Sequence, residues 1–235
     1  MAISTKYGRT FHYPFSPGTT SDDRIQHNYW ELLSKIPNVV HTEKLDGENN
    51  CLSRLGVFAR SHGAPTTSPW TETLRRFWQL IRNDLGSLEI FLENLYAVHS
   101  IDYHNLDHHF FVFAIRENDH WLSWEETKFY ANLIDLPVVP ELKITKPASE
   151  KSLFEREIVN LASESGTFNP FDVQTKAPCT MEGIITRNTE GYPVKLFSEN
   201  VFKYVRKGHV KTDQHWTKTW KRASLNQEGG NYVDY

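Results

Sequence analysis

Short stretches rich in β-branched and aromatic residues alternate irregularly with amphipathic segments along this chain, and that order restricts the fold more than any other feature. The first helix is expected to run from a cap at Ser21, Asp22 or Asp23 through Ile36. Because the order is not a regular strand–helix–strand alternation, it predicts an α+β fold with mostly antiparallel sheets and flanking helices. Strands are expected at 39–43, 50–55, 57–61, 90–98, 110–115, 181–186 and 200–205, and further helices at 69–82, 123–134, 151–162 and 212–221.

The chain is predicted to form one domain over residues 1–235, because no Pro/Gly/Ser-rich linker divides it. Its 39% hydrophobic and 13% aromatic content excludes a disordered chain. Only two cysteines, Cys51 and Cys179, are present, which excludes a disulfide framework and a Cys-rich zinc site. No apolar run approaches the roughly 18 residues that a membrane span needs. We therefore expect a monomeric, cytoplasmic protein with no membrane partner.

The formal net charge of −3 excludes a general basic coat for nucleic acid, but it allows a local basic patch. Arg75, Arg76 and Arg82 form either a solvated helix face or a phosphodiester contact, and the residues alone leave both open. The segment 205–216 mixes cations with aromatic residues, a combination that suits single-stranded nucleic acid through phosphate pairing and base stacking. The same residues also fit a closing helix that packs Trp216 on the core, and the sequence leaves both interpretations open.

The most informative stretch is Glu43-Lys44-Leu-Asp-Gly-Glu-Asn49, which lies where a predicted strand ends. The Asp-Gly pair marks a turn, so the lysine can lie in a pocket rather than in water. A free lysine has a pKa of about 10.4 and is a poor nucleophile near neutral pH. Burial or a nearby cation would lower that pKa and expose the lone pair. Taken by itself, the stretch also fits a surface hairpin.

Five further stretches follow in order, each in a strand-like context: Phe58–Gly63, Phe91–Tyr96, Phe110–Ile115, Met181–Thr186 and Val201–Arg206. Together with Lys44–Gly47 they resemble the motifs of the ATP-dependent RNA ligases, which belong to the covalent nucleotidyltransferase superfamily with the DNA ligases and mRNA capping enzymes. The resemblance spans residues 44–206. It implies a ligase-type (ATP-grasp-like) nucleotidyltransferase domain. Only 30 residues follow Val205, so no OB-fold domain is expected.

The resemblance implies that Lys44 attacks the α-phosphate of ATP and carries AMP as a phosphoramidate. It places Glu43 as an acceptor for the adenine amino group and Asn49 at a water or phosphate contact. Arg60 would reach a ribose or phosphate oxygen through its planar guanidinium. Only 43 residues precede Lys44, so no nicotinamide module is expected, and ATP is predicted as the donor rather than GTP or NAD.

Glu93 lies within an apolar run, where ribose hydroxyls would supply the donors that a buried carboxylate needs. The resemblance places Phe113 against the adenine face, although Phe111 has the same strand parity and competes for that role. Glu182 would hold Mg²⁺ or Mn²⁺ against the phosphates, with Glu93 as a second ligand. Lys203 would bind the α-phosphate.

One position departs from the motifs of the resemblance. Many members of that family carry a second lysine two residues after the first in the last strand, and here Val205 occupies that place. Either Arg206 takes over the phosphate contact or Lys203 acts without help. Arg206, Lys207 and Lys211 are predicted to contact RNA phosphates.

The resemblance therefore implies an ATP-dependent RNA ligase that joins an RNA 3′-hydroxyl to a 5′-phosphate and prefers RNA to DNA on the 3′-hydroxyl strand. The alternatives are a DNA ligase, a capping-type nucleotidyltransferase, or a nucleotide- or RNA-binding module without catalysis. The short segment after Val205 disfavours the first two. The intact set of Lys44, Glu93, Glu182 and Lys203 disfavours the third.

Overall fold

A computed structural model describes residues 6–61, 63–208, 217 and 220–226. Two sheets dominate it, and every pairing inside them is antiparallel except that between β1 and β13. The α+β prediction with mostly antiparallel sheets is therefore confirmed. The five-stranded sheet has the order β1 (Phe11–His12), β13 (Val201–Val205), β11 (Gly183–Asn188), β2 (Val39–Lys44) and β9 (Glu141–Thr145).

The six-stranded sheet has the order β12 (Tyr192–Pro193), β8 (His120–Trp121), β7 (Phe110–Glu117), β5 (Leu88–Asn94), β3 (Glu48–Ser53) and β4 (Gly56–Ala59). A small third sheet pairs β6 (Ile101–Tyr103) with β10 (Pro170–Asp172). The helices are α1 (Tyr29–Leu33), α2 (Glu72–Ile81), α3 (Trp124–Leu133), α4 (Lys151–Ala162) and α5 (Phe197–Asn200), with 3₁₀ turns η1 (Pro69–Thr71) and η2 (Val194–Leu196). No helix among the described residues is long and apolar enough to cross a membrane.

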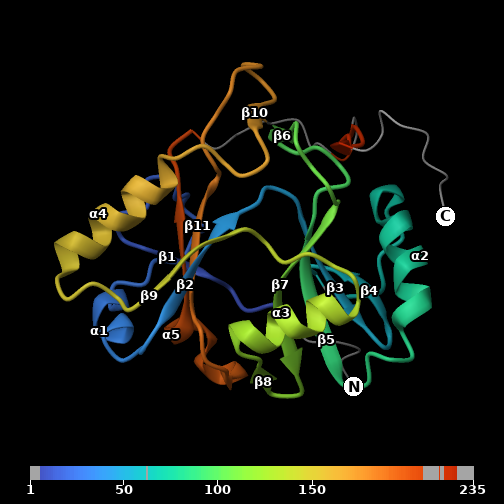
Figure 1. The fold of residues 1–235 in the computed structure, drawn as a ribbon, viewed down its shortest axis with the longest axis horizontal. Coiled ribbons are helices and arrows are strands. Elements are labelled where there is room, and N and C mark those ends of the chain that lie inside the picture. Colours follow the sequence, from blue (N-terminus) through green and yellow to red (C-terminus); the bar gives the residue numbers. More distant parts are fainter. Residues whose placement is uncertain (1–5, 62, 209–216, 218–219, 227–235) are drawn as a thin grey trace.

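The two large sheets face each other, and helices cover their outer faces (Figure 1). The helices α1 and α4 cover the five-stranded sheet through side chains such as Leu33 and Phe154. The helices α2 and α3 cover the six-stranded sheet through Leu74 and Ala131. Between the sheets lies an aromatic core that includes the side chain of Phe91. Since β7 is covered on both faces, its sequence is continuously apolar rather than alternating.

The structure confirms several local expectations. The helix after Ser123 has a capping box, in which the Ser123 hydroxyl accepts from the Glu126 N–H and the Glu126 carboxylate accepts from the Ser123 N–H. The helix over 151–162 has the predicted bounds. Most of the helix expected over 212–221 lies outside the described residues.

The prediction for the first helix is wrong, because α1 begins only at Tyr29. The carboxylate of Asp23 does not cap it but accepts hydrogen bonds from the N–H and hydroxyl of Thr20. Arg24 and Ile25 are extended rather than helical, because Ile25 forms a parallel β-bridge with His12. Tertiary contacts therefore override the capping signal of Ser21–Asp23.

Other strand bounds differ by a few residues, and the short strands β1, β6, β8, β9, β10 and β12 were not expected. The strand predicted at 90–98 ends at Asn94, whose side-chain oxygen accepts from the Tyr96 N–H and begins a turn. The strand predicted at 181–186 begins at Gly183. Of these unexpected strands, β9 is the longest, and it lies at the sheet edge, where its side chains are largely exposed and the sequence shows no apolar alternation.

Candidate active site

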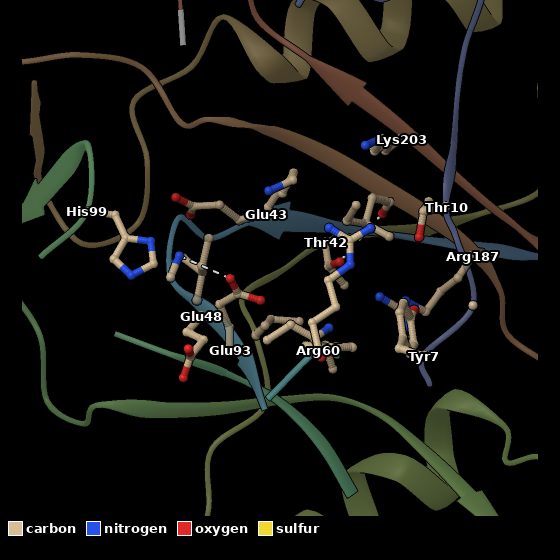
Figure 2. A pocket seen from close by; sticks show the side chains of 18 residues that line it. Tyr7, Thr10, Thr42, Glu43, Glu48, Arg60, Glu93, His99, Arg187 and Lys203 are labelled. Carbon is tan, nitrogen blue, oxygen red and sulfur yellow. Dashed lines mark hydrogen bonds between the residues drawn. The ribbon is translucent and has the colours of Figure 1, made fainter. Parts of the chain in front are cut away.

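A cavity of about 410 Å³ opens between the two large sheets beside the end of β2. Its size is within the range of small-molecule sites. The cavity wall contains seven of the residues that the sequence predicted as nucleotide contacts: Glu43, Lys44, Asn49, Arg60, Glu93, Phe113 and Lys203. In Figure 2, Glu43 and Lys203 reach the cavity from strands of the five-stranded sheet, and Glu93 reaches it from a strand of the six-stranded sheet. Residues distant in sequence thus meet at one place.

Lys44 forms an ion pair with the eighth predicted residue, Glu182, at 2.5 Å between Nζ and Oε2. The pair forms because β2 and β11 place Lys44 directly opposite Gly183. A Cβ atom on Gly183 would lie 1.9 Å from the carbonyl oxygen of Tyr204, so only glycine allows β11 and β13 to approach this closely.

The electrostatics at Lys44 differ from the sequence-based expectation. Burial lowers the pKa of Lys44, but the carboxylates of Glu182, Glu93 and Asp46 outweigh that effect and raise its pKa above the usual value. Without nucleotide, Lys44 is therefore a protonated ion-pair partner rather than an exposed lone pair. Some other charge must loosen the ion pair before the amine can react.

Hydrogen bonds to two other segments, residues 100–101 and Glu93 of β5, fix the turn after Lys44. Asp46 Oδ2 accepts from the N–H groups of Ser100 and Ile101, each at 2.9 Å, and from the Ser100 hydroxyl. Gly47 N donates to Glu93 Oε1 at 3.0 Å. Asp46 therefore serves to hold the turn, and the turn holds Lys44 at the cavity.

Burial raises the pKa of the Glu93 carboxyl to about 8, with the charge of Lys44 opposing that rise and Glu182 adding to it. Glu93 lies in the cavity wall opposite Lys203 in the view of Figure 2. A carboxyl group of this pKa exchanges its proton near neutral pH, so it can either accept from or donate to a hydroxyl group in the cavity.

Glu43 is only 1% exposed, and its carboxylate is half satisfied. Oε2 accepts from the Thr167 N–H at 2.8 Å, while Oε1 is buried without a hydrogen-bond partner among the described residues. Burial raises the pKa of this carboxyl group. Gly166 packs so closely that a Cβ atom there would lie 2.6 Å from Oε1. An unpartnered acceptor at a cavity wall is suited to an amino group of a ligand.

The choice between Phe111 and Phe113 is informed by their surroundings. Phe113 lines the cavity, and its ring lies 5.1 Å from the ring of Tyr7. Phe111 packs against Phe168, with ring centroids 5.0 Å apart, and is not among the described residues that line the cavity. Phe113 is therefore the ring placed for stacking, and contact with adenine stays a prediction.

Lys203 lies at the other side of the cavity, where its Nζ is 3.3 Å from Asp23 Oδ1. Burial lowers the pKa of Lys203, while Asp23 opposes that fall and the charge of Lys44 adds to it. Arg60 and Arg187 also extend into the cavity (Figure 2). Cations from four separate chain positions thus surround a space that suits a polyphosphate.

Sequence reasoning missed several residues of the wall. Arg187 is 6% exposed and lies on the same face of β11 as Gly183 and Ile185, so strand alternation after the motif could have found it. Tyr7 and Thr10 also line the cavity, but they belong to an N-terminal segment that carries no local signal. Thr42 and Glu48 also line the cavity and were not singled out.

The structure separates the predicted RNA contacts from the cavity. Val205, at the position of the second lysine, is 6% exposed. Arg206 is half-buried, is not among the described residues that line the cavity, and its N–H donates to the Glu182 carbonyl. Lys207 is exposed, and Lys211 lies outside the described residues. Of the motif's cations, Lys203 is thus the one at the cavity.

A model of the RNA ligase family matches residues 37–205, which is more than half of the chain. The chain therefore belongs to the RNA ligase family. No curated protein sequence matches it significantly.

Solved structures of a Naegleria gruberi RNA ligase share the fold. A mutant in apo form is 17% identical with a TM-score of 0.54, and the match covers 87% of this chain and 59% of that one. The ligase with PPi is 17% identical with a TM-score of 0.54, covering 88% and 61%. A mutant with ATP and Mn is 14% identical with a TM-score of 0.55, covering 89% and 60%. The chain thus spans about three-fifths of the length of these matched structures.

Proposed function

We propose that this protein is an ATP-dependent RNA ligase in which Lys44 takes AMP from ATP and passes it to a 5′-phosphate. The observation that carries the proposal is the meeting of Lys44, Glu93 and Lys203 around one cavity beside the half-satisfied Glu43. The Naegleria ligase structures named above contain ATP with Mn, or PPi. Those ligands belong to that protein, and they support a nucleotide and a divalent metal here.

In the proposed first step, the Lys44 amine loses a proton and forms a bond to the α-phosphorus of ATP. The bond from that phosphorus to its bridging oxygen breaks, and pyrophosphate leaves. An oxygen of an RNA 5′-phosphate then attacks the same phosphorus, and the Lys44 amine leaves and regains a proton. A 3′-hydroxyl finally attacks the activated 5′-phosphorus, its proton is released, and AMP departs.

The carboxylates of Glu182 and Glu93 are the chain's groups that would hold Mg²⁺ or Mn²⁺, since hard cations prefer carboxylate oxygens. No group of three or more metal-ligating side chains occurs among the described residues. That donor set fits an ion held by one or two carboxylates together with substrate phosphates, as Mg²⁺ commonly is. When bound, the metal would supply neutralisation of phosphate charge and weaken the hold of Glu182 on Lys44.

Adenine recognition is assigned to Glu43 and Phe113. The unpartnered Oε1 of Glu43 can accept a hydrogen bond from the adenine amino group, whereas the guanine carbonyl would face it as a second acceptor. A buried acceptor left unpaired costs about 1–3 kcal/mol, which is about tenfold to a hundredfold in affinity. ATP is therefore proposed as the donor. A cytoplasmic location is proposed as well, because a chain with only two cysteines suits a reducing compartment.

Intact-mass measurement after incubation with ATP and Mg²⁺ or Mn²⁺ tests the first step. The wild type should gain the mass of one AMP, and Lys44→Ala should gain none. Lys35→Ala is the matched control, because Lys35 is an exposed lysine whose ammonium pairs with Glu31 away from the cavity. Lys44→Ala should still seal RNA that has been adenylylated beforehand, since only the first two steps use the amine. No AMP gain by the wild type with either metal would favour a binding module instead.

Sealing of matched substrates tests the RNA assignment. The last two nucleotides on the 3′-hydroxyl side are made either ribose or deoxyribose, and rates are compared at two salt concentrations. RNA should be sealed faster, because a 2′-hydroxyl and A-form shape can be read over few nucleotides. The rate should fall with salt if cations such as Arg206 and Lys207 bind phosphates. Equal rates on both sugars would indicate a general polynucleotide ligase.

A further inference from the structure

The segment 11–24, called here the N-terminal strap, wraps around β13, the strand that carries Lys203. β1 pairs in parallel with β13 and places His12 opposite Lys203. The strap then turns, with Gly18 N donating to the Val205 carbonyl at 2.9 Å, and returns so that His12 N donates to the Arg24 carbonyl at 2.8 Å. The family match begins only at residue 37, so it assigns no role to the strap.

Side chains of the strap form a chain of contacts that starts and ends on β13. Val205 N donates to Ser16 Oγ at 2.9 Å, and Ser16 Oγ lies 2.9 Å from His12 Nδ1. His12 Nε2 lies 3.1 Å from Asp23 Oδ1, and the same oxygen lies 3.3 Å from Lys203 Nζ. Two residues of one strand, Lys203 and Val205, are thus linked through the strap.

The carboxylate of Asp23 is held from both sides. Oδ2 accepts from the N–H and the hydroxyl of Thr20, each at 3.0 Å, while Oδ1 faces His12 and Lys203. His12 is 1% exposed, and burial together with the charge of Lys203 lowers its pKa to about 4, so it is neutral at pH 7. In the tautomer with its proton on Nε2, the ring presents an N–H toward Asp23 Oδ1, 3.1 Å away, and its Nδ1 can accept from the Ser16 hydroxyl.

The negative charge of Asp23 balances the positive charge of Lys203 separately from the pair that Lys44 forms with Glu182. Lys44 and Lys203 are two ammonium groups that repel each other across one cavity, and each has its own carboxylate partner, Glu182 and Asp23. Their tasks in the proposed reaction are opposite, because Lys44 must lose a proton and Lys203 must keep one. Glu182 contacts Lys44, which lines the cavity, and a metal bound with the phosphates would compete with Lys44 for that carboxylate. Asp23 is tied to Thr20 and His12 and stays in place.

We propose that Asp23 and His12 are positioning residues that hold the ammonium of Lys203 toward the cavity as a permanent positive charge. The inference rests on the proposed function of the same cavity, where Lys203 would bind the α-phosphate as charge shifts onto the leaving pyrophosphate. Because that contact strengthens as charge develops, its loss should lower the rate of AMP attachment more than it weakens ATP binding.

The test compares Asp23→Asn with Asp22→Asn in single-turnover AMP attachment. Asn has the shape of Asp without its charge, and Asp22 is exposed. Asp23→Asn should lower the rate at saturating ATP by about tenfold or more, with the ATP concentration for half-maximal rate changed less than about threefold. Asp22→Asn should equal the wild type. His12→Gln, which keeps a donor near Asp23, should be faster than His12→Ala.

Thr20→Val is a milder variant for the case in which Asp23→Asn does not fold. Thr20 is exposed, and the change removes only one donor to Asp23. A smaller loss in the same direction is expected. A rate within twofold of wild type for folded Asp23→Asn would overturn the inference, as would an equal loss in Asp22→Asn.

A second measurement is independent of ligase activity. Lys203 acylation is followed by mass spectrometry at pH 8 in the absence of nucleotide, with Lys35 as the internal reference. Lys203 should react at least about threefold faster in Asp23→Asn, because loss of the carboxylate lowers the pKa of Lys203 and leaves more of its amine unprotonated at pH 8. Equal acylation in both proteins would overturn the inference even if AMP attachment occurs. If the wild type takes no AMP, the proposed function is wrong. Faster acylation of Lys203 in Asp23→Asn would then still support the coupling between Asp23 and Lys203.

Discussion

The ammonium of Lys44 and the carboxylate of Glu182 are 2.5 Å apart, and this ion pair keeps the proposed nucleophile protonated while the cavity holds no nucleotide. An amine in that form does not attack phosphorus or any other electrophile. The pair therefore protects Lys44 until a bound metal and phosphates compete for Glu182.

Replacing Glu182 by Gln should separate its contribution to AMP attachment from its effect on the protonation of Lys44. AMP attachment should fall by about 100-fold, because an electrostatic contact to the transition state is lost. Acylation of Lys44 in the absence of ATP should rise severalfold, because its pKa falls without the carboxylate. Mass spectrometry measures both. Glu164→Gln, an exposed change, is the control. A decrease in both rates would contradict the protective role of the pair.

Replacing Glu43 by Gln should change the choice of nucleotide. The amide offers a donor where the carboxylate offers only acceptors, so the ratio of GMP to AMP attachment should rise about tenfold. The measurement is the mass gain with GTP and with ATP at equal concentrations. Glu190→Gln, on the exposed surface, should leave the ratio unchanged. An unchanged ratio of GMP to AMP attachment in Glu43→Gln would show that residues other than Glu43 recognise adenine.

A methyl group at Gly183 should destabilise the protein strongly. Its carbon would lie 1.9 Å from the Tyr204 carbonyl oxygen, so β11 and β13 would have to separate. The free energy of unfolding of Gly183→Ala should fall by about 3 kcal/mol or more. Urea unfolding measures it, with Gly63→Ala as control because a Cβ atom there meets nothing within 4 Å. Similar urea midpoints for both variants would show that β11 and β13 can separate enough to accommodate a methyl group at little cost in stability.

The buried His12 should make stability fall in acid. Its pKa is about 4 in the folded protein against a usual 6.5, so the unfolded chain binds a proton between these values that the folded chain does not. Stability is therefore lost as pH falls from 6.5 to 4, by up to about 3 kcal/mol for this residue.

Urea unfolding of wild type and His12→Gln at pH 7 and pH 4.5 checks this dependence. The variant should lose less stability between the two pH values than the wild type. It should still lose some, because burial also lowers the pKa of His41 to about 4. Equal losses in the two proteins would show that His12 titrates near its usual pKa when folded.

The candidate site residues that the sequence predicted belong to short stretches with fixed spacing on strands. Lys44 and Glu182 each lie where a strand ends or begins, and both are followed closely by a glycine. Such signals are local, because strand geometry fixes which neighbours of a motif residue face the same way. The helix caps at Ser123 and the apolar run of β7 were readable for the same reason.

The sequence by itself therefore predicted the class of fold, the sequential positions of the main strands, and most of the candidate site residues near Lys44, several of which the cavity brings together. Only the tertiary structure decided how the strap at 11–24 is used. Asp23 looked like a helix cap, and in the folded chain it faces Lys203 from 180 residues away in sequence. The physical reason is that ion pairs and parallel strand pairing across such separations leave no periodicity in the sequence, so only the packed chain brings their members together.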